Sequence, residues 1–358
     1  MSKLNIEVKK VTDSRIAEVD FENLSFGEEF SDHQFEIRYD NGAWQTPRIL
    51  PYDAVPMYPA ISTIHYGQAV FEGMKAFRYR GDKANIFRVD MHYDRFVRSC
   101  KRVCIPEIPR EYFIEGLKTL IDLERDWIPE AKYKSLYIRP IVFAADQTLG
   151  LRSSKTYRLH IICSPVGNYY AEGIKPIRLT TMPEYVRAVK GGVGDAKVPG
   201  NYAASLEPTI KAQQQGYTQV LWLDAIERKY VEEVGSMNIF FLIGDTLVTP
   251  PINGSILPGV TRNSVLEIAK AEGMKVEERP VSIDELIEAS RNGDLKEIFG
   301  SGTAAVISPV GSINHEGQHI TVSTTSDEMG PVARRFYDQI TGIHHGEIPD
   351  EYSWCTVI

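Results

Sequence analysis

The chain has 358 residues, of which 43% are hydrophobic and 25% are charged, and its formal net charge is −8. This length favours two domains, and this composition is typical of a globular protein rather than a disordered one. The negative charge argues against nucleic-acid binding, which needs a basic face. The sequence has no apolar run of about 18 residues and no apolar region near its start, so neither a membrane span nor a secretory signal is expected.

The cysteine content is too low for a disulfide scaffold. The four cysteines are Cys100, Cys104, Cys163 and Cys355. Cys100 and Cys104 are four residues apart on a predicted helix, and no further Cys or His stands at ligand spacing. Core thiols are therefore favoured over a metal site, and a reducing cytoplasm fits this usage.

The first half of the chain predicts mixed strands and helices. Alternating or continuous apolar stretches predict strands at 35–39, 85–89, 135–144 and 157–163. A helix is predicted to begin after an N-cap at Asp90 and to end before Pro106 and Pro109. A second helix is predicted around 113–121, where apolar residues recur at helical spacing.

The second half mixes the two types again after a stretch interrupted by proline and glycine. We predict a small N-terminal domain at 1–170, a linker at 171–180 and a large C-terminal domain at 181–358. A strand is predicted at 218–224, a hairpin around Gly244-Asp245, and a helix capped by Ser282 with Glu285 in a capping-box pattern. Because strands and helices interleave irregularly, two α+β domains are favoured over a doubly wound sheet.

Several familiar motifs are absent from the sequence. There is no P-loop, no complete dinucleotide-binding fingerprint, no nucleophile elbow and no zinc-protease helix. The pair His344-His345 is expected at the surface near the C-terminus, without a metal.

The most unusual stretch is residues 191–202, which hold four glycines and one proline around Lys197. This composition disfavours a regular helix or an interior strand. A lysine in such a loop is usually a solvated tip. A rigid loop would instead fix the direction of the amine, which is what a Schiff-base lysine needs.

Pyridoxal-phosphate chemistry makes further demands that the sequence can meet. A carboxylate must pair with the pyridine nitrogen, and Glu233 can supply it, whereas its neighbour Glu232 is expected to be solvated. The phosphate needs an arginine and backbone N–H groups, for which Arg95, the helix start at 259–264 and the glycine-rich stretch 300–303 are candidates. Each of these signals is weak alone.

Together these segments resemble the branched-chain aminotransferases of fold type IV. The resemblance runs from about Tyr39 to the C-terminus. The segments that carry it are 65–77, 135–140, 191–202, 233–238, 256–260 and 299–304. It implies a two-domain α+β enzyme with a smaller N-terminal α/β domain and a larger C-terminal pseudo-barrel domain. It also implies transamination of L-leucine, L-isoleucine and L-valine with 2-oxoglutarate, with pyridoxal 5′-phosphate as the cofactor.

The resemblance also implies the roles of individual residues. Lys197 would form the Schiff base and move the proton between Cα and C4′, Tyr202 would bind the phenolic oxygen, and Glu233 the pyridine nitrogen. The other residues expected to bind the cofactor are Arg95, Ser236, Val260, Thr261 and Thr303.

The substrate contacts follow from the same resemblance. The main chain of Thr303 and Ala304, with Tyr66, would hold the α-carboxylate. The apolar pocket would be lined by Phe71, Tyr137 and Tyr169, with Leu151 supplied to the partner subunit of a homodimer.

Arg139 could bind the γ-carboxylate of glutamate at the edge of that pocket, or could be a structural arginine paired with a strand neighbour.

The sequence departs from the family at two places. Ala305 and Ser308 replace the Cys-x-x-Cys pair of some animal members, which removes a thiol switch, and Pro199 replaces a common glycine, which should stiffen the loop.

Two alternatives remain open from the residues. Within the same fold, a D-amino acid aminotransferase or an aminodeoxychorismate lyase would use the same lysine chemistry. The aromatic set and the long N-terminal half favour the branched-chain interpretation. In a different class, a non-catalytic pyridoxal-phosphate carrier could keep Lys197 and Arg95 while lacking substrate contacts. The presence of Tyr66, Tyr137 and Tyr202 argues against a carrier.

Overall fold

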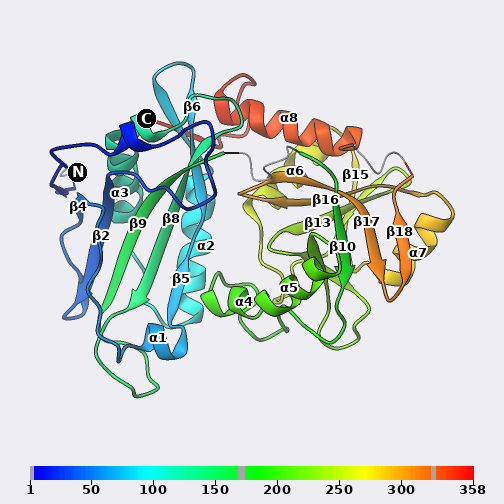
Figure 1. The fold of residues 1–358 in the computed structure, drawn as a ribbon, viewed down its shortest axis with the longest axis horizontal. Coiled ribbons are helices and arrows are strands. Elements are labelled where there is room, and N and C mark those ends of the chain that lie inside the picture. The colour runs from blue at the N-terminus through cyan, green and yellow to red at the C-terminus, as the bar shows by residue number, and fades with distance from the viewer. Residues whose placement is uncertain (1–3, 168–173, 324–327) are drawn as a thin grey trace. The chain divides into compact units, whose positions relative to one another are not determined.

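The computed structural model describes residues 4–167, 174–323 and 328–358. The chain forms two compact units (Figure 1). The first unit consists of Met1–Tyr169, Ala196–Pro199 and Gly342–Ile358, and the second of Tyr170–Asp195 and Gly200–Thr341. A short excursion of the chain at 196–199 therefore brings Lys197 into the first unit.

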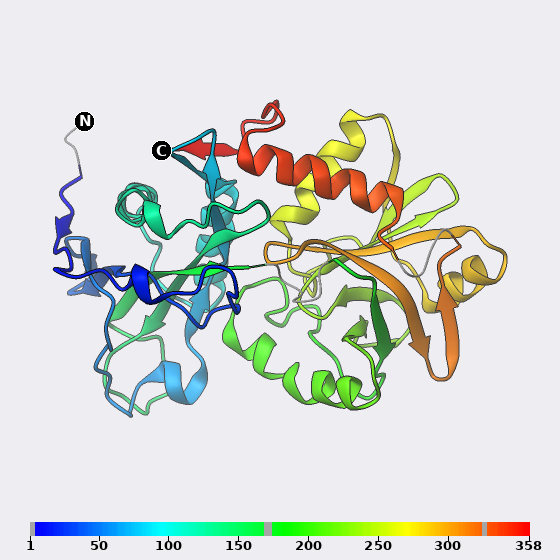
Figure 2. The same ribbon diagram turned by 45° about the horizontal axis from the view of Figure 1, so that its top comes forward.

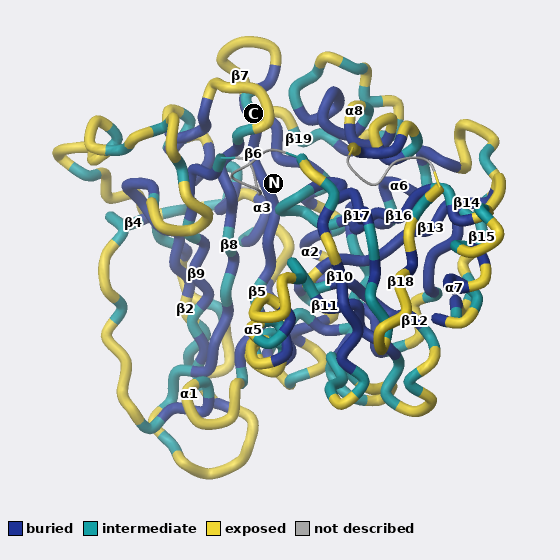
Figure 3. Tube along the Cα trace, turned by 45° about the vertical axis from the view of Figure 1, so that its right-hand side comes forward, coloured by how far each residue is buried: buried dark blue, intermediate teal, exposed yellow. Residues whose placement is uncertain are grey.

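The first unit is built on a sheet that has ten strands within the described residues. These strands are β1 (Glu7–Val8), β2 (His33–Asp40), β3 (Ala43–Trp44), β4 (Arg48–Pro51), β5 (Ala69–Phe71), β6 (Met74–Tyr79), β7 (Lys83–Phe87), β8 (Ser135–Ala144), β9 (Tyr157–Val166) and β19 (Cys355–Val357). Their order is β1-β4-β2-β9-β8-β6-β7-β19, with β3 on β2 and β5 on β8. The central strands β8 and β9 are antiparallel along their full length, and Figure 3 shows both mostly buried. The strands predicted at 35–39, 135–144 and 157–163 are confirmed.

Helices cover this sheet. They are α1 (Ser62–Tyr66), α2 (Val89–Arg102) and α3 (Arg110–Leu123), with the short 3₁₀ helices η1 (Ile16–Glu18) and η2 (Arg125–Trp127). α2 packs beside β5 and α3 beside β2. The buried stripe of α2 contains apolar Phe96 and Cys100, as helical spacing predicts, but also the polar residues His92, Arg95 and Ser99.

The start and end of α2 differ from the sequence prediction. Asp90 is not the N-cap: α2 begins at Val89, and Arg88 makes the turn from β7 with a left-handed φ of 52°. The main chain of Arg88 is held there by a hydrogen bond to the carbonyl of Trp354. Cys104 lies beyond the end of the helix and is exposed, so Cys100 alone of this pair is a core thiol.

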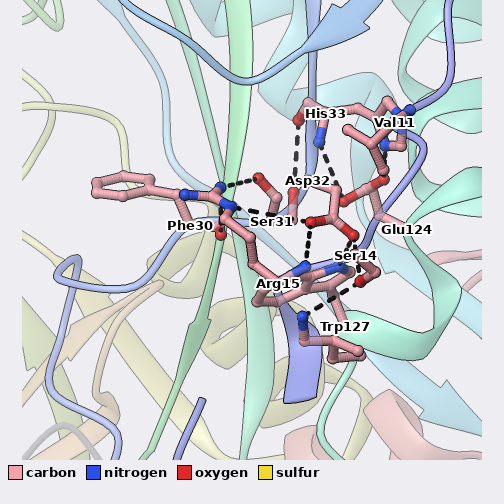
Figure 4. A network of polar contacts seen from close by, with 10 residues as sticks. Val11, Ser14, Arg15, Phe30, Ser31, Asp32, His33, Glu124 and Trp127 are labelled. Carbon is pink, nitrogen blue, oxygen red and sulfur yellow. Dashed lines mark hydrogen bonds and ion pairs between the residues drawn. The ribbon is translucent and has the colours of Figure 1, made fainter. Parts of the chain in front are cut away.

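A buried polar network fixes the N-terminal segment onto the first unit (Figure 4). The N–H of Val11 donates to Nε2 of His33 over 2.9 Å. Nε2 must therefore be an acceptor, so Nδ1 carries the proton of the neutral ring and donates to Glu124. The histidine thus connects a surface segment to the core in one tautomer.

Asp32 also binds this segment, and its carboxylate accepts three hydrogen bonds. Its carboxylate accepts from the hydroxyl of Ser14 at 2.5 Å, the N–H of Arg15 at 3.0 Å and the indole of Trp127 at 3.1 Å. Burial by itself raises the pKa of Asp32, but these hydrogen bonds outweigh it and keep the pKa below the ordinary 3.8.

We expect Asp32→Asn to lower the free energy of unfolding at pH 7 by roughly 1–3 kcal/mol, because an amide cannot accept from all three donors. Since the folded pKa lies below the unfolded one, the contribution of the carboxylate is present above pH 3.8 and is lost as the pH falls through the lower folded value. Calorimetry of both proteins at pH 7 and pH 3 should show the difference shrinking in acid. An equal difference at both pH values would contradict this role of the carboxylate.

The second unit is built on a sheet that has nine strands within its described residues. They are β10 (Ile177–Thr181), β11 (Gln219–Leu223), β12 (Val231–Val234), β13 (Asn238–Ile243), β14 (Thr246–Thr249), β15 (Lys275–Glu278), β16 (Leu295–Gly302), β17 (Val306–His315) and β18 (Gln318–Thr321). Their order is β12-β11-β10-β17-β16-β13-β14-β15, with β18 on β17. The other helices of the described residues are α4 (Pro199–Ala203), α5 (Leu206–Gln214), α6 (Val260–Ala271), α7 (Ile283–Arg291) and α8 (Pro331–His345).

Local signals in the second half agree with the structure. β13 and β14 form the predicted hairpin, in which Gly244 has the positive φ of 59° that a tight turn favours. Ser282 caps α7 by accepting from the N–H of Glu285 at 3.1 Å. The side chain of Glu285 turns instead to Arg279, so the reciprocal half of the capping box is not made.

The C-terminal end of the chain corrects another expectation. Residues 346–354 connect α8 to the last strand, β19, which pairs with β7 in the first sheet (Figure 2). His344 is not at the surface: it is 4% exposed, and its ring stacks on Phe77 with ring centroids 4.1 Å apart. In the part of the chain that the structure describes, no helix has both the length and the apolar character needed to span a bilayer.

Candidate active site

Lys197 is held by its main chain within the first unit. Its N–H donates to Oγ of Ser99 over 3.0 Å, and its carbonyl accepts from the N–H of Phe71 over 3.1 Å. Residues 191–196 form turns, as their glycines predict. The end of the segment differs from the prediction, because α4 begins at Pro199, where the fixed φ and missing N–H of proline suit a first helical position.

The amine of Lys197 lies over one ring of a cluster formed by Phe71, Tyr137 and Arg139. Nζ of Lys197 lies 4.9 Å from the ring centre of Phe71. The guanidinium of Arg139 lies 4.8 Å from the same ring centre and donates to the hydroxyl of Tyr137 over 3.0 Å. The structure therefore brings together four of the residues singled out from the sequence.

Arg95 is buried and bound to a residue that sequence reasoning missed. Its Nε and Nη2 donate to the two carboxylate oxygens of Glu72, at 2.8 and 2.5 Å. The arrangement is a bidentate ion pair, which fixes the plane of the guanidinium. Glu72 lies next to Phe71 in the sequence, so a carboxylate at the end of a buried strand was the signal that could have revealed it.

His92 completes this buried group. Its Nδ1 lies 3.3 Å from the Glu72 carboxylate. Burial lowers the pKa of His92, although the hydrogen bond to Glu72 works in the opposite direction. For Glu72, burial raises the pKa, but Arg95 and then His92 outweigh it and hold the pKa well below 4.5. A neutral histidine and an ionised glutamate therefore surround Arg95 at neutral pH.

Glu233 lies in the second unit and has its own partners. It forms an ion pair with Arg187, and its Oε1 accepts from the amide of Asn238 over 3.3 Å. Arg187 was not singled out from the sequence. Glu233 is 3% exposed, so the guanidinium and the amide orient a carboxylate that is almost excluded from bulk water.

A polar pocket in the second unit contains several of the predicted residues. It is lined by Arg187, Asn201, Tyr202, Ser205, Glu233, Gly235, Ser236 and Leu257. The structure thus places Tyr202, Glu233 and Ser236 around one pocket. Glu232 points elsewhere and is not solvated as expected: it is 5% exposed and accepts a hydrogen bond from Ser255.

The predicted helix start is confirmed at α6. Val260 and Thr261 are its first two residues, and Gly259 before them makes no side-chain cap, so the first N–H groups have no partner inside the helix. Gly259 itself is required, because a Cβ there would meet Oδ1 of Asn238 at 1.9 Å. Backbone donors of this kind suit an anion.

The glycine-rich stretch 300–303 differs from the predicted nest. Gly300 and Gly302 lie in strand β16, and the turn is formed by residues 303–305. The main chain of Thr303 and Ala304 is therefore at the strand end, in a turn rather than in a glycine loop.

The remaining predicted residues are more exposed. Tyr66 ends α1 and donates to the carbonyl of Leu149 over 2.7 Å. Leu151 is 83% exposed. Tyr169 lies outside the described residues. Across the described ranges, no group of three or more His, Cys, Asp or Glu side chains is arranged to hold a metal ion.

Comparison with known proteins adds the following. Residues 69–313 match the family described as Amino-transferase class IV. The branched-chain-amino-acid aminotransferase 2 of Bacillus subtilis (strain 168) is 49% identical over 360 residues, which cover 100% of this chain and 98% of the relative.

Solved structures agree with these sequence matches. The branched-chain amino acid aminotransferase of Escherichia coli superimposes with a TM-score of 0.73 at 27% identity, over 89% of this chain and 98% of the other. Another branched-chain amino acid aminotransferase, solved with pyridoxamine 5′-phosphate, superimposes with a TM-score of 0.72 at 28% identity, over 89% of this chain and 97% of the other.

Proposed function

This chain belongs to the class IV aminotransferases and, within them, to the branched-chain amino acid aminotransferases, and we propose that it exchanges amino groups between L-leucine, L-isoleucine or L-valine and 2-oxoglutarate. The products would be the branched-chain 2-oxo acids and L-glutamate. The observation that carries the proposal is the fixed, half-buried setting of Lys197, whose main chain is bound to the helix that presents Arg95.

Pyridoxal 5′-phosphate is the cofactor that we propose, because the donor set matches its functional groups. In the first unit, Lys197 offers a primary amine for the aldehyde and Arg95 a fixed guanidinium for the phosphate. In the second unit, Glu233 offers a carboxylate for the pyridine nitrogen and Tyr202 a phenol for the phenolic oxygen. Ser236, the first amides of α6 and Thr303 would add donors to the cofactor. The relative solved with pyridoxamine 5′-phosphate supports the same choice.

When bound, the cofactor supplies an electron sink that stabilises negative charge at the substrate's Cα. Lys197 would hold the cofactor through a Schiff base, and Nζ would take the proton from Cα and return it at C4′. Glu233 would keep the pyridine nitrogen protonated, since a carboxylate beside a cation favours the charged form. Arg95, oriented by Glu72, would fix the phosphate and hence the ring.

The cluster around Lys197 fits the two kinds of substrate. Phe71 and Tyr137 present aromatic surface for a branched aliphatic side chain. The guanidinium of Arg139 lies over both rings, so it could bind the γ-carboxylate of glutamate at the same place. The main chain of Thr303 and Ala304, with Tyr66, would bind the α-carboxylate.

The proposal includes a homodimer to which Leu151 contributes. Leu151 and Leu149 are large apolar side chains that are 83% and 60% exposed in this chain. Exposed apolar residues this close together are typical of a contact surface. Tyr169 would line the pocket as well, on the strength of the resemblance alone.

A substrate panel tests the proposed function. We expect turnover with L-leucine, L-isoleucine and L-valine when 2-oxoglutarate is the acceptor, and little with D-alanine or aminodeoxychorismate. The visible absorbance of the holoprotein should bleach when L-valine is added without an acceptor. No turnover of L-leucine would refute the substrate assignment, and an unchanged spectrum under L-valine would favour a carrier protein.

A further inference from the structure

A single buried hydroxyl joins the main chain of Lys197 to the helix turn that carries Arg95. Ser99 lies one turn after Arg95 on α2 and is 0% exposed. Its Oγ accepts from the N–H of Lys197 at 3.0 Å and donates to the carbonyl of Arg95 at 2.8 Å. Both roles of the hydroxyl are therefore used.

The carbonyl of Lys197 is also connected to Arg95 through few residues. This carbonyl accepts a hydrogen bond from the N–H of Phe71. The next residue, Glu72, accepts hydrogen bonds from the guanidinium of Arg95 with both carboxylate oxygens. These contacts close a ring that runs from Lys197 through Phe71, Glu72, Arg95 and Ser99 back to Lys197. Both ends of the lysine's backbone are thus fixed relative to Arg95.

Regular secondary structure does not provide a hydrogen-bond acceptor for the N–H of Lys197. Residue 197 lies after the turns at 191–196 and before α4, so neither a helix nor a strand supplies a partner for its N–H. A main-chain donor in such a place needs a side-chain acceptor or water. Ser99 is that acceptor, and it comes from the same face of α2 as Arg95.

We propose that Ser99 is a positioning residue, which sets the direction of the Lys197 amine relative to the phosphate held at Arg95. The proposal rests on the proposed role of Lys197. Small displacements of a reacting group lower reaction rates strongly even where binding is preserved. The predicted signature is therefore slow covalent capture of the cofactor with normal non-covalent binding.

Two forms of the cofactor separate these effects in the full-length apoprotein. In capture of pyridoxal 5′-phosphate, the Nζ lone pair of Lys197 adds to the aldehyde carbon, and one water leaves as the carbon–nitrogen double bond forms. Pyridoxamine 5′-phosphate has no aldehyde, so its Kd measures non-covalent binding alone. For Ser99→Ala, we expect stopped-flow capture to slow by about 10- to 100-fold, with the pyridoxamine 5′-phosphate Kd unchanged within about twofold.

Matched variants make the result decisive. Ser99→Thr keeps the hydroxyl and should restore most of the capture rate, whereas Ser99→Cys keeps the volume with a weaker acceptor and should remain slow even if Ser99→Ala folds poorly. Ser135→Ala removes another fully buried hydroxyl, one with no hydrogen-bond partner among the described residues, and should capture normally. Capture at the wild-type rate by Ser99→Ala, or an equal loss for both cofactor forms, would overturn the positioning role. If Lys197→Ala also captured the aldehyde at the wild-type rate, the proposed role of Lys197, rather than that of Ser99, would be wrong.

Discussion

Replacing Lys197 with alanine is expected to lower kcat for transamination by at least about 10⁴-fold, the upper end of what one positioned proton-transfer group contributes. The change removes both the amine that would hold the cofactor and the base that would act at Cα. We expect the fold to be retained, because the main-chain hydrogen bonds of residue 197 to Ser99 and Phe71 do not depend on its side chain. Steady-state assays with L-leucine and 2-oxoglutarate, alongside circular dichroism, test both parts.

A second lysine in the adjoining segment provides the control. Lys190 is exposed and precedes the turns at 191–196, so Lys190→Ala should keep kcat within about twofold of the wild type. Borohydride reduction of the holoprotein, followed by peptide mass spectrometry, should place the cofactor on residue 197 alone. Substantial turnover by Lys197→Ala, or a label on another lysine, would refute the assignment.

The elements of the fold that the sequence predicts best are those with a strong local pattern. The run 135–144 is continuously apolar enough to read as a buried strand, and β8 has those bounds. The helix around 113–121 is predicted by the helical spacing of its apolar residues, and the cap of α7 by the hydroxyl of Ser282. The two-domain α+β fold implied by the resemblance is confirmed by the solved relatives, which match about nine-tenths of the chain.

Local propensity fails where the tertiary structure decides. Asp90 is a good cap residue, yet β7 runs so directly into α2 that Arg88 must make the turn, with its main chain tied to Trp354. The glycines at 300 and 302 suggest a loop, but pairing of β16 with β13 and β17 keeps them extended. In both cases strand pairing outweighs the preference of single residues.

The partners of the site residues could not be read from the sequence at all. Lys197 and Ser99 are 98 positions apart, and Arg95 and Glu72 are 23 apart. No spacing rule relates such pairs, because they meet only once the sheet and α2 have packed. The sequence thus singles out Lys197, Arg95 and Glu233 as candidates, whereas it gives no sign of the groups that orient them.

Arg95→Ala is expected to weaken the binding of pyridoxal 5′-phosphate to the apoprotein by at least about 100-fold, since each hydrogen bond to a charged group contributes about 1.5–3 kcal/mol. It should also lower the free energy of unfolding by about 3–5 kcal/mol, because it leaves the carboxylate of Glu72, which is 0% exposed, without its guanidinium. Equilibrium dialysis and urea unfolding measure the two effects. The ratio of kcat/KM for L-leucine and L-valine at saturating cofactor should change less than about threefold.

The pH dependence and a double variant separate the two losses. In the wild type the pKa of Glu72 is held below 4.5, so the ion pair stabilises the fold above that pH and the contribution is lost only as the pH falls through the lower folded value. Without Arg95, only His92 still opposes burial, and we expect burial to outweigh it and raise this pKa, so that ionisation of Glu72 costs stability as the pH rises above 4.5. The stability gap between Arg95→Ala and wild type should therefore be wider at pH 7 than at pH 5. Adding Glu72→Gln removes the buried charge and should restore most of the stability but not the cofactor affinity. Recovery of both would show that Arg95 acts on the fold rather than on the phosphate.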